Sequence, residues 1–154
     1  RVYRALGART VCYLPEVAAG KAPPVPSPRI TYAPGAVDLP AAFAEADLGV
    51  CHGGDATVAQ ALLARVPVLL LPMQAEQFAF ARNMERRGLA LNAGAQPRPA
   101  DYGALARRLL GEPGFRERAG AFAERHAGFD RAGQTRALVD RIEAVMAGAA
   151  GAAG

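Results

Sequence analysis

Two short polar segments of the sequence carry residue types that could bind a ligand. In the first, His52-Gly53-Gly54 follows a short apolar run. Thr57 comes three positions later and opens a helix predicted over residues 57–65. Glycine lets a ligand approach the backbone closely, and the free N–H groups at a helix start favour phosphate. With the His52 ring and the Thr57 hydroxyl, this loop could hold a diphosphate, although an ordinary strand–helix turn has the same pattern.

The second segment, residues 72–76, follows the next apolar run and precedes a helix predicted over residues 77–87. Glu76 and Gln77 supply a carboxylate and an amide, which suit the hydroxyl groups of a sugar. Alone, the pair would be explained by the helix start, where negative charge is favoured. Met73 suits either this site or a core contact. Because both segments follow strands, together they predict a phosphate site next to a polyol site.

The elements around these segments alternate between strand and helix. The strands are predicted at residues 10–14, 29–32, 48–51, 66–71 and 89–92, and the helices at residues 1–7 (a helix end), 39–46, 57–65, 77–87, 99–110, 114–127 and 133–147. Uninterrupted apolar strands are typical of a parallel sheet covered on both faces. With right-handed crossovers this gives an α/β fold, a doubly wound, mostly parallel Rossmann-like sheet with helices on both faces. Ligands bind such sheets at the carboxyl ends of the strands, where both segments fall.

The composition fits one domain and argues against nucleic acid as a partner. We expect the domain to cover residues 1–147 of the 154, followed by a flexible Ala/Gly tail at 148–154. The net charge is +4, but Lys21 is the only lysine, the arginines are spread along predicted helices, and aromatic residues make up only 6%. Such a sequence offers no platform for stacking bases. The mild positive charge still favours an anionic small ligand.

The two cysteines, Cys12 and Cys51, fall in strands that we expect to be buried, where free thiols behave as small apolar groups. Their spacing indicates neither a disulfide framework nor a zinc site and fits a reducing compartment, and we expect a cytoplasmic location. No apolar run approaches the ~20 residues of a membrane span. The sequence opens with Arg1 inside a predicted helix end, so we expect a missing upstream region. The lack of a signal peptide is then uninformative.

The order of the motifs resembles the donor-binding, C-terminal half of GT-B glycosyltransferases, a group that includes UDP-glucuronosyltransferases and antibiotic or macrolide glycosyltransferases. The resemblance covers roughly residues 10–110. It is carried by His52-Gly53-Gly54, Thr57, Ala61-Leu62, Val66-Pro67, Pro72, Glu76-Gln77, Ala81, Arg82 and Gly88.

The resemblance implies a role for each group of residues toward a nucleotide-sugar. His52, Gly53, Gly54 and Thr57 would hold the diphosphate, Gln60 the ribose, Glu76 and Gln77 the sugar, and the backbone around Ala33, Pro34 and Val37 would face the base. It also implies that no metal or other cofactor is needed, since the nucleotide-sugar is a substrate.

The implied reaction is inverting transfer of a sugar from a UDP- or dTDP-sugar to a small-molecule or lipid acceptor. The resemblance places the catalytic base in an N-terminal acceptor domain that this chain does not contain, so we expect no catalytic residue here. The first strand of the donor domain, with its own glycine-rich turn, is also expected to be absent. A peripheral contact with a membrane is compatible with a lipid acceptor.

Three positions depart from the family pattern. Asp55 stands where a neutral residue is usual, and its carboxylate could cap the helix and repel phosphate. Gln60 replaces a common ribose-binding glutamate and loses charge assistance, and Phe80 replaces a common asparagine. These departures keep open a non-catalytic GT-B-like binding or auxiliary module. A nucleotide-sugar epimerase of the same architecture is a third alternative, although Asp55 and Glu76 are the only candidate carboxylates for its cleft.

Overall fold

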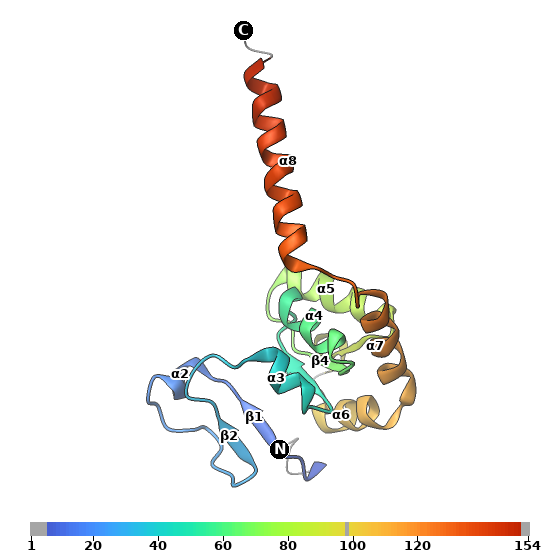
Figure 1. The fold of residues 1–154 in the computed structure, drawn as a ribbon. Coiled ribbons are helices and arrows are strands. Elements are labelled where there is room, and N and C mark those ends of the chain that lie inside the picture. The colour runs from blue at the N-terminus through green and yellow to red at the C-terminus, as the bar shows by residue number, and fades with distance from the viewer. Residues whose placement is uncertain (1–5, 98, 152–154) are drawn as a thin grey trace.

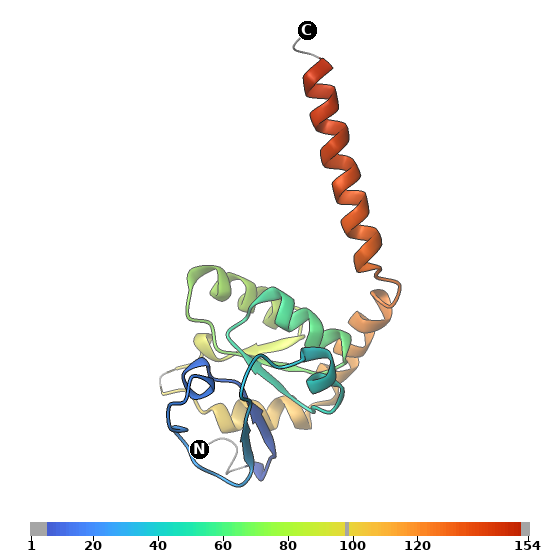
Figure 2. The ribbon, with the colours of Figure 1, turned by 60° about the vertical axis from the view of Figure 1, so that its left-hand side comes forward.

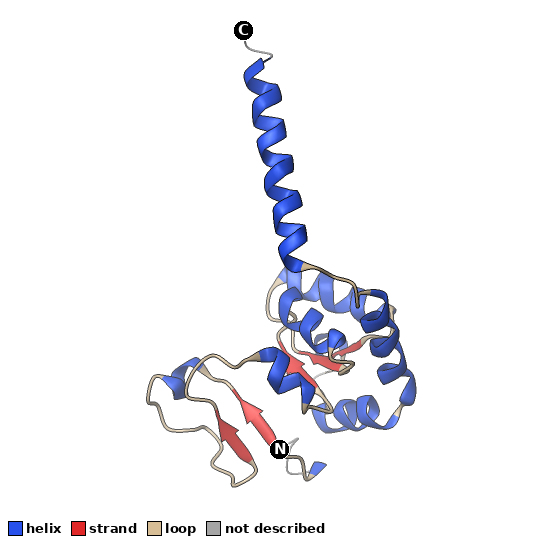
Figure 3. Cartoon of the chain, in the orientation of Figure 1, coloured by secondary structure: helices blue, strands red, loops and turns tan. Residues whose placement is uncertain are grey.

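The structure is a computed structural model that describes residues 6–97 and 99–151. Short strands alternate with helices along the chain (Figures 1 and 3). The elements are β1 (Thr10–Cys12), α2 (Pro15–Ala18), β2 (Ile30–Tyr32), α3 (Leu39–Ala44), β3 (Gly49–Cys51), α4 (Asp55–Leu63), β4 (Val68–Leu70), α5 (Ala75–Arg86), β5 (Ala90–Asn92), the 3-10 turn η1 (Ala93–Ala95), α6 (Tyr102–Gly111), α7 (Pro113–Arg125) and α8 (Arg131–Gly151). Every predicted strand is present in shortened form, while the helix end predicted over residues 1–7 lies largely outside the described residues.

The strands form two parallel sheets. β1 pairs with β2, with Thr10 opposite Ile30, and β4 lies between β3 and β5, with Val68 opposite Gly49 and Ala90. The predicted parallel arrangement is confirmed, but the expectation of a single continuous sheet is wrong for the described residues. The physical reason is that β1 and β3 both stand at sheet edges, and the described part of the chain supplies no strand to join them.

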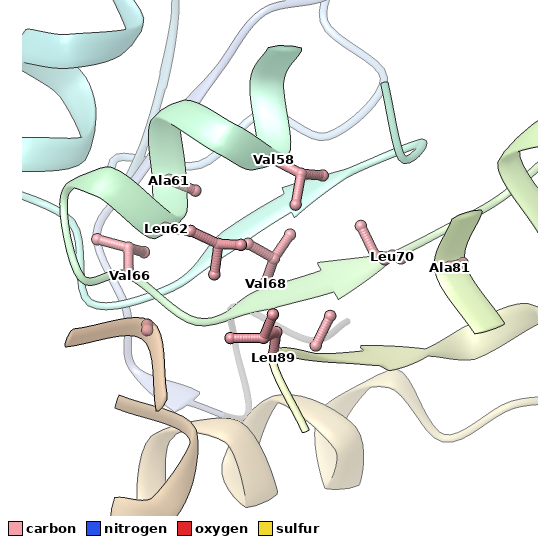
Figure 4. Close-up of a cluster of buried hydrophobic side chains, with 10 residues drawn as sticks. Val58, Ala61, Leu62, Val66, Val68, Leu70, Ala81 and Leu89 are labelled. Atoms are coloured by element: carbon pink, nitrogen blue, oxygen red, sulfur yellow. The ribbon is translucent and has the colours of Figure 1, made fainter. Parts of the chain in front are cut away.

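The larger sheet is covered on both faces at β4 and β5, as predicted. Its edge strand β3 is not, because Val50 is 56% exposed and Cys51 is half-buried, so the expectation of a buried strand around Cys51 is wrong. Side chains of β4 alternate between two hydrophobic clusters. Val68 and Leu70 pack with residues of α4, α5 and α7, in the cluster drawn in Figure 4. Leu69 points to the opposite face, where it packs with Leu105 and Leu109 of α6. Burial of a strand from both sides explains why its sequence is apolar throughout.

The smaller sheet is open. Val11, at the centre of β1, is 64% exposed, and Cys12 is only half-buried. The expectation that residues 10–14 form a buried strand is therefore wrong. Ile30 of β2 is buried, and the Tyr32 hydroxyl donates to the Val25 carbonyl at 3.1 Å, which ties the long proline-rich loop to the sheet.

Helix α8 projects away from the rest of the protein in two views (Figures 1 and 2). It runs to Gly151, four residues beyond the predicted end at Ala147. The mobility of residues 148–154 and the domain boundary at 147 stay predictions. No helix in the described ranges is long and apolar enough to cross a membrane.

Candidate functional site

The loop after β3 turns sharply into α4. Gly53 is buried and has a φ of 95°, a region that favours glycine, whereas Gly54 is extended and acts as the helix N-cap. Helix α4 therefore begins at Asp55, two residues before the predicted start at Thr57. This correction brings the helix N-terminus closer to the glycine pair, which is the arrangement that a phosphate site needs.

The first backbone hydrogen bond of α4 runs from the Val58 N–H to the Gly54 carbonyl at 3.1 Å. The N–H groups of Asp55, Ala56 and Thr57 precede it and have no carbonyl partner within the helix. One of these donors is already used, because the Asp55 Oδ1 atom accepts from the Ala56 N–H at 2.7 Å. The expectation that the Asp55 carboxylate could cap α4 is wrong, because Gly54 holds the N-cap position and the carboxylate accepts only from the adjacent Ala56 N–H.

The two predicted loops lie against each other. A Cβ atom placed on Gly53 would come within 3.8 Å of the Gln77 carbonyl oxygen and 3.9 Å of the Gln77 Cβ. The β3–α4 loop therefore lies next to the first turn of α5, at one edge of the larger sheet. This contact also means that a side chain at position 53 would fill the space between them.

Helix α5 begins at Ala75, so Glu76 and Gln77 lie within its first turn and not at its start as predicted. Gln74 is extended and holds the N-cap position. The Gln77 Oε1 atom accepts from the Met73 N–H at 2.9 Å, so this amide oxygen ties the β4–α5 loop to the helix. Glu76 is exposed, and its carboxylate is the more accessible of the two groups.

A hollow of about 700 Å³ opens beside these loops, at the carboxyl ends of β4 and β5. It is lined by His52, Leu71, Pro72, Met73, Phe78, Ala93, Gly94, Pro99, Ala100 and Tyr102. Among the predicted donor residues, this lining includes His52 alone. Gly53, Gly54, Thr57, Gln60, Glu76 and Gln77 lie outside it.

The residues predicted to face the base belong to the other sheet. Ala33, Pro34 and Val37 follow β2, and the Ala33 N–H donates to the Cys12 carbonyl at 2.9 Å, which extends the β1–β2 ladder by one residue. These three residues do not line the hollow. Their role toward a nucleotide stays a prediction.

A third loop, after β5, also meets the hollow and is absent from the sequence-based prediction. Asn92 is buried, its Oδ1 atom accepts from the Gly94 N–H at 3.0 Å, and its own N–H donates to the Glu85 carboxylate at 3.1 Å. A Cβ atom on Gly94 would come within 2.5 Å of Phe78 and 2.9 Å of Pro72. The signal that could have found this loop is the Asn-Ala-Gly sequence directly after an apolar strand, which repeats the position of the first two loops.

The surroundings of Cys51 and Phe80 account for the pKa of the first and the role of the second. Burial raises the pKa of the Cys51 thiol, and a backbone hydrogen bond from Gly53 partly opposes that rise. Phe80 packs against the core cluster of β4, α4 and α5, so this departure from the family pattern supports the core. In the described ranges, no group of three or more His, Cys, Asp or Glu residues is placed to hold a metal ion.

Comparisons with known proteins fit this geometry. The family model of the glycosyltransferase family 28 C-terminal domain matches residues 20–99, more than half of the chain. A Symbiobacterium thermophilum UDP-N-acetylglucosamine–N-acetylmuramyl-(pentapeptide) pyrophosphoryl-undecaprenol N-acetylglucosamine transferase is 35% identical over 98 residues, which are 60% of this chain and 26% of that protein. The zeaxanthin glucosyltransferase of Pseudescherichia vulneris is 33% identical over 112 residues, which are 73% of this chain and 26% of that protein. The chain thus spans about a quarter of the length of these curated relatives.

Solved structures show the same fold. The spinosyn rhamnosyltransferase SpnG superimposes with a TM-score of 0.73 at 23% identity, over 90% of this chain and 39% of that one. The glycosyltransferase VinC, in complex with dTDP, gives a TM-score of 0.67 at 23% identity, over 86% of this chain and 33% of that one. The Rossmann-like fold predicted from the sequence is confirmed by these similarities.

Proposed function

The chain belongs to the family of glycosyltransferase family 28 C-terminal domains, and from this premise we propose that it forms the donor-binding part of an inverting glycosyltransferase. The donor is a UDP- or dTDP-sugar, and the acceptor is a small molecule or a lipid. The two curated relatives are a UDP-N-acetylglucosamine-dependent transferase and a glucosyltransferase, and the dTDP complex of VinC adds the second nucleotide. The proposal includes no metal ion, no other cofactor and no nucleic acid, and it places the protein in the cytoplasm.

The observation that carries the proposal is the contact between Gly53 and Gln77. It brings the glycine turn that leads into α4 next to the first turn of α5, which also carries the exposed Glu76. A nucleotide-sugar presents a diphosphate directly followed by a ring of hydroxyl groups. A helix N-terminus beside a turn that carries a carboxylate suits that order.

Catalysis by such a site is electrostatic. The acceptor oxygen attacks the anomeric carbon, the bond from that carbon to the diphosphate oxygen breaks, and the nucleoside diphosphate leaves with the bonding pair. Its growing negative charge is stabilised by the helix N-terminus and by a hydrogen bond from His52. We place the base that takes the acceptor's proton outside this chain.

The test is calorimetric titration of the chain with UDP and with dTDP. A hydrogen bond to a charged group contributes roughly 1.5–3 kcal/mol, so His52→Ala should weaken nucleotide binding by about 10- to 150-fold. His126→Ala is the matched control, because His126 is the only other histidine and lies at the end of α7. Equal affinity in the His52 variant, with a lowered melting temperature, would assign His52 to the fold and refute the proposal.

The presence of Asp55 favours a second candidate function, a non-catalytic binding module of the same fold that no longer uses a nucleotide-sugar donor. The Asp55 carboxylate adds negative charge at the start of α4 and occupies the Ala56 N–H. Under the first proposal, Asp55→Asn should tighten UDP binding several-fold at low salt and less at high salt, because ions screen the repulsion. A chain that binds neither UDP nor dTDP, with or without this substitution, would favour the second candidate.

A further inference from the structure

A buried polar side chain stands at the end of β5, in a row of the sheet that is otherwise apolar. Asn92 is 3% exposed, and it is the one buried polar or charged residue in the part of the chain that the structure describes. Across the sheet, the same row continues with Leu70 of β4 and Cys51 of β3. Burying an amide costs free energy unless its polar atoms are bonded. The bonds that Asn92 makes must therefore offset that cost.

Asn92 bonds both to its own loop and to helix α5. Its Oδ1 atom accepts from the Gly94 N–H at 3.0 Å, which closes the loop after β5 into a tight turn. Its backbone N–H donates to the Glu85 carboxylate at 3.1 Å, near the C-terminal end of α5. A hydrogen bond to a charged acceptor is stronger than one between neutral groups. The first bond thus fixes the shape of the loop, and the second ties the loop to α5.

Gly94 meets the opposite end of α5. A Cβ atom on Gly94 would lie 2.5 Å from the Phe78 ring and 2.9 Å from the Pro72 side chain, so both side chains rest against the glycine backbone. Phe78 belongs to the first turn of α5 and directly follows Glu76 and Gln77. Pro72 stands in the loop that leads into this turn. The position of Gly94 therefore helps to set the position of the turn.

The start of α4 is held by different bonds. Its first backbone hydrogen bond, from the Val58 N–H to the Gly54 carbonyl, lies within the glycine turn and the helix itself. In the proposed function this helix start holds the diphosphate, whereas Glu76 and Gln77 hold the sugar. A change at Asn92 should thus displace the sugar-binding groups and leave the diphosphate-binding groups in place.

We propose that Asn92 is a positioning residue for the sugar part of the donor. Through the backbone of Gly94 it sets the place of Phe78 and Pro72, and with them the first turn of α5. Glu85 contributes by tying the same loop to the other end of the helix. The inference rests on the proposed function, which gives the first turn of α5 its role toward the sugar.

The first test compares the affinities of UDP and UDP-glucose for variants of the whole 154-residue chain. Asn92→Ala should weaken UDP-glucose binding about two- to twelvefold, the factor for one neutral hydrogen bond, and leave UDP binding nearly unchanged. Asn92→Ser should recover most of this loss, because a hydroxyl oxygen also accepts from an N–H two residues further on. Since the two variants leave similar cavities, the difference between them reports the bond to Gly94.

Two further positions keep the test decisive. Asn83→Ala is the matched control, because Asn83 is the only other asparagine, is exposed, and accepts a hydrogen bond from Arg87 on the same helix. It should leave both affinities unchanged. Glu85→Ala covers the case in which Asn92→Ala does not fold, because it removes the tie to α5 from a half-buried position. It should give the same selective loss, and Glu85→Gln, which keeps an acceptor, should lose less.

Hydrogen exchange measured by NMR tests the coupling without any nucleotide. The N–H groups of Met73 and Phe78 are both hydrogen-bonded at the first turn of α5 and report on its local opening. Both should exchange faster in Asn92→Ala than in the unaltered protein. The Val58 N–H, at the start of α4, should exchange at the same rate in both.

Faster exchange at Met73 and Phe78, together with a loss confined to UDP-glucose, would support the proposal. Unchanged exchange at these two groups would overturn it. A UDP-glucose affinity that stays the same, or that falls by the same factor as the affinity for UDP, would overturn it as well, since Asn92 would then serve the fold alone. A chain that shows the exchange pattern but binds neither UDP nor UDP-glucose would refute the proposed function, while the positioning of this turn by Asn92 would stand.

Discussion

The sheet of β3, β4 and β5 and the sheet of β1 and β2 are both parallel, but helices enclose β4 and β5 far more than β1, while Val50 of the edge strand β3 is 56% exposed. Leu69 at the centre of β4 is 2% exposed, whereas Val11 at the centre of β1 is 64% exposed. The enclosed sheet carries all three loops that meet at the hollow. The open sheet carries the loop predicted to face the base. Burial of a strand is therefore decided by the elements that pack on it, and not by its own apolar sequence.

The same contrast appears in how the loops are held. Beside the enclosed sheet, side-chain hydrogen bonds fix two of them, from the Met73 N–H to Gln77 and from the Gly94 N–H to Asn92. Beside the open sheet, the long loop before β2 is tied by the bond from Tyr32 to the Val25 carbonyl.

The largest expected effect concerns stability. Leu70 is fully buried in β4, so Leu70→Ala should lower the free energy of unfolding by about 2–5 kcal/mol. Val11→Ala should change it by no more than about 0.5 kcal/mol, because the side chain already faces water. Urea unfolding of both variants measures the difference. Similar losses for the two would mean that β1 is covered in solution, and the contrast between the sheets would fail.

This contrast also shows what could be predicted from the sequence. The apolar runs at residues 66–71 and 10–14 look alike locally, and the pattern predicts burial for both. Only the first is buried, because α4, α5, α6 and α7 enclose it. Burial depends on contacts between distant parts of the chain, which no local pattern contains.

The starts of helices α4 and α5 also differ from the prediction. Both α4 and α5 begin two residues before their predicted starts at Thr57 and Gln77. The prediction relies on residue type, whereas the extended backbones of Gly54 and Gln74 set the actual N-caps. In contrast, the meeting of the first two loops is predictable, because neighbouring parallel strands bring their carboxyl ends to one edge.

Other features of the candidate site lie beyond the sequence. The bond from the Met73 N–H to Gln77 is a matter of rotamer and loop path, so the pattern cannot show that this amide is already engaged. The role of Gly94 depends on where Phe78 of α5 lies in space, which the sequence around either residue does not contain. These contacts determine the hollow, which is why its aromatic wall is missing from the prediction.

The second prediction compares two glycines with nearly the same backbone conformation. Gly53 has a φ of 95° in the enclosed region, and Gly20 has a φ of 94° in the open one. Alanine is strained at both positions, and each substitution should cost up to about 1–2 kcal/mol of stability. Only Gly53→Ala should also weaken UDP binding, by about tenfold or more, since it displaces donors at the start of α4.

Thermal melts and UDP titrations of both glycine variants test this expectation. A methyl group added at Gly20 would meet open space, so its loop can relax more easily than the one at Gly53, where Gln77 is 3.8 Å away. Loss of UDP affinity in Gly20→Ala, at equal folded fraction, would show that the open region participates in binding the diphosphate. The assignment of diphosphate binding to the larger sheet alone would then be incorrect.

The smallest expected effect concerns the two cysteines, each of which ends a strand at the carboxyl edge of its sheet. Burial raises the pKa of both thiols, so both are largely protonated at neutral pH. The thiolate is the reactive form, and alkylation by iodoacetamide should therefore speed up as the pH rises toward about 9 and above.

Cys51 accepts a hydrogen bond from the backbone of Gly53, whereas Cys12 lies on the open sheet. Saturating UDP should slow alkylation of Cys51 a few-fold, by covering the loop, and leave Cys12 unchanged. Mass spectrometry of the two peptides over time gives both rates from one sample, with Cys12 as the internal control. Equal slowing at both thiols would indicate a general tightening of the fold, and no slowing at Cys51 would place the nucleotide away from the Gly53 turn.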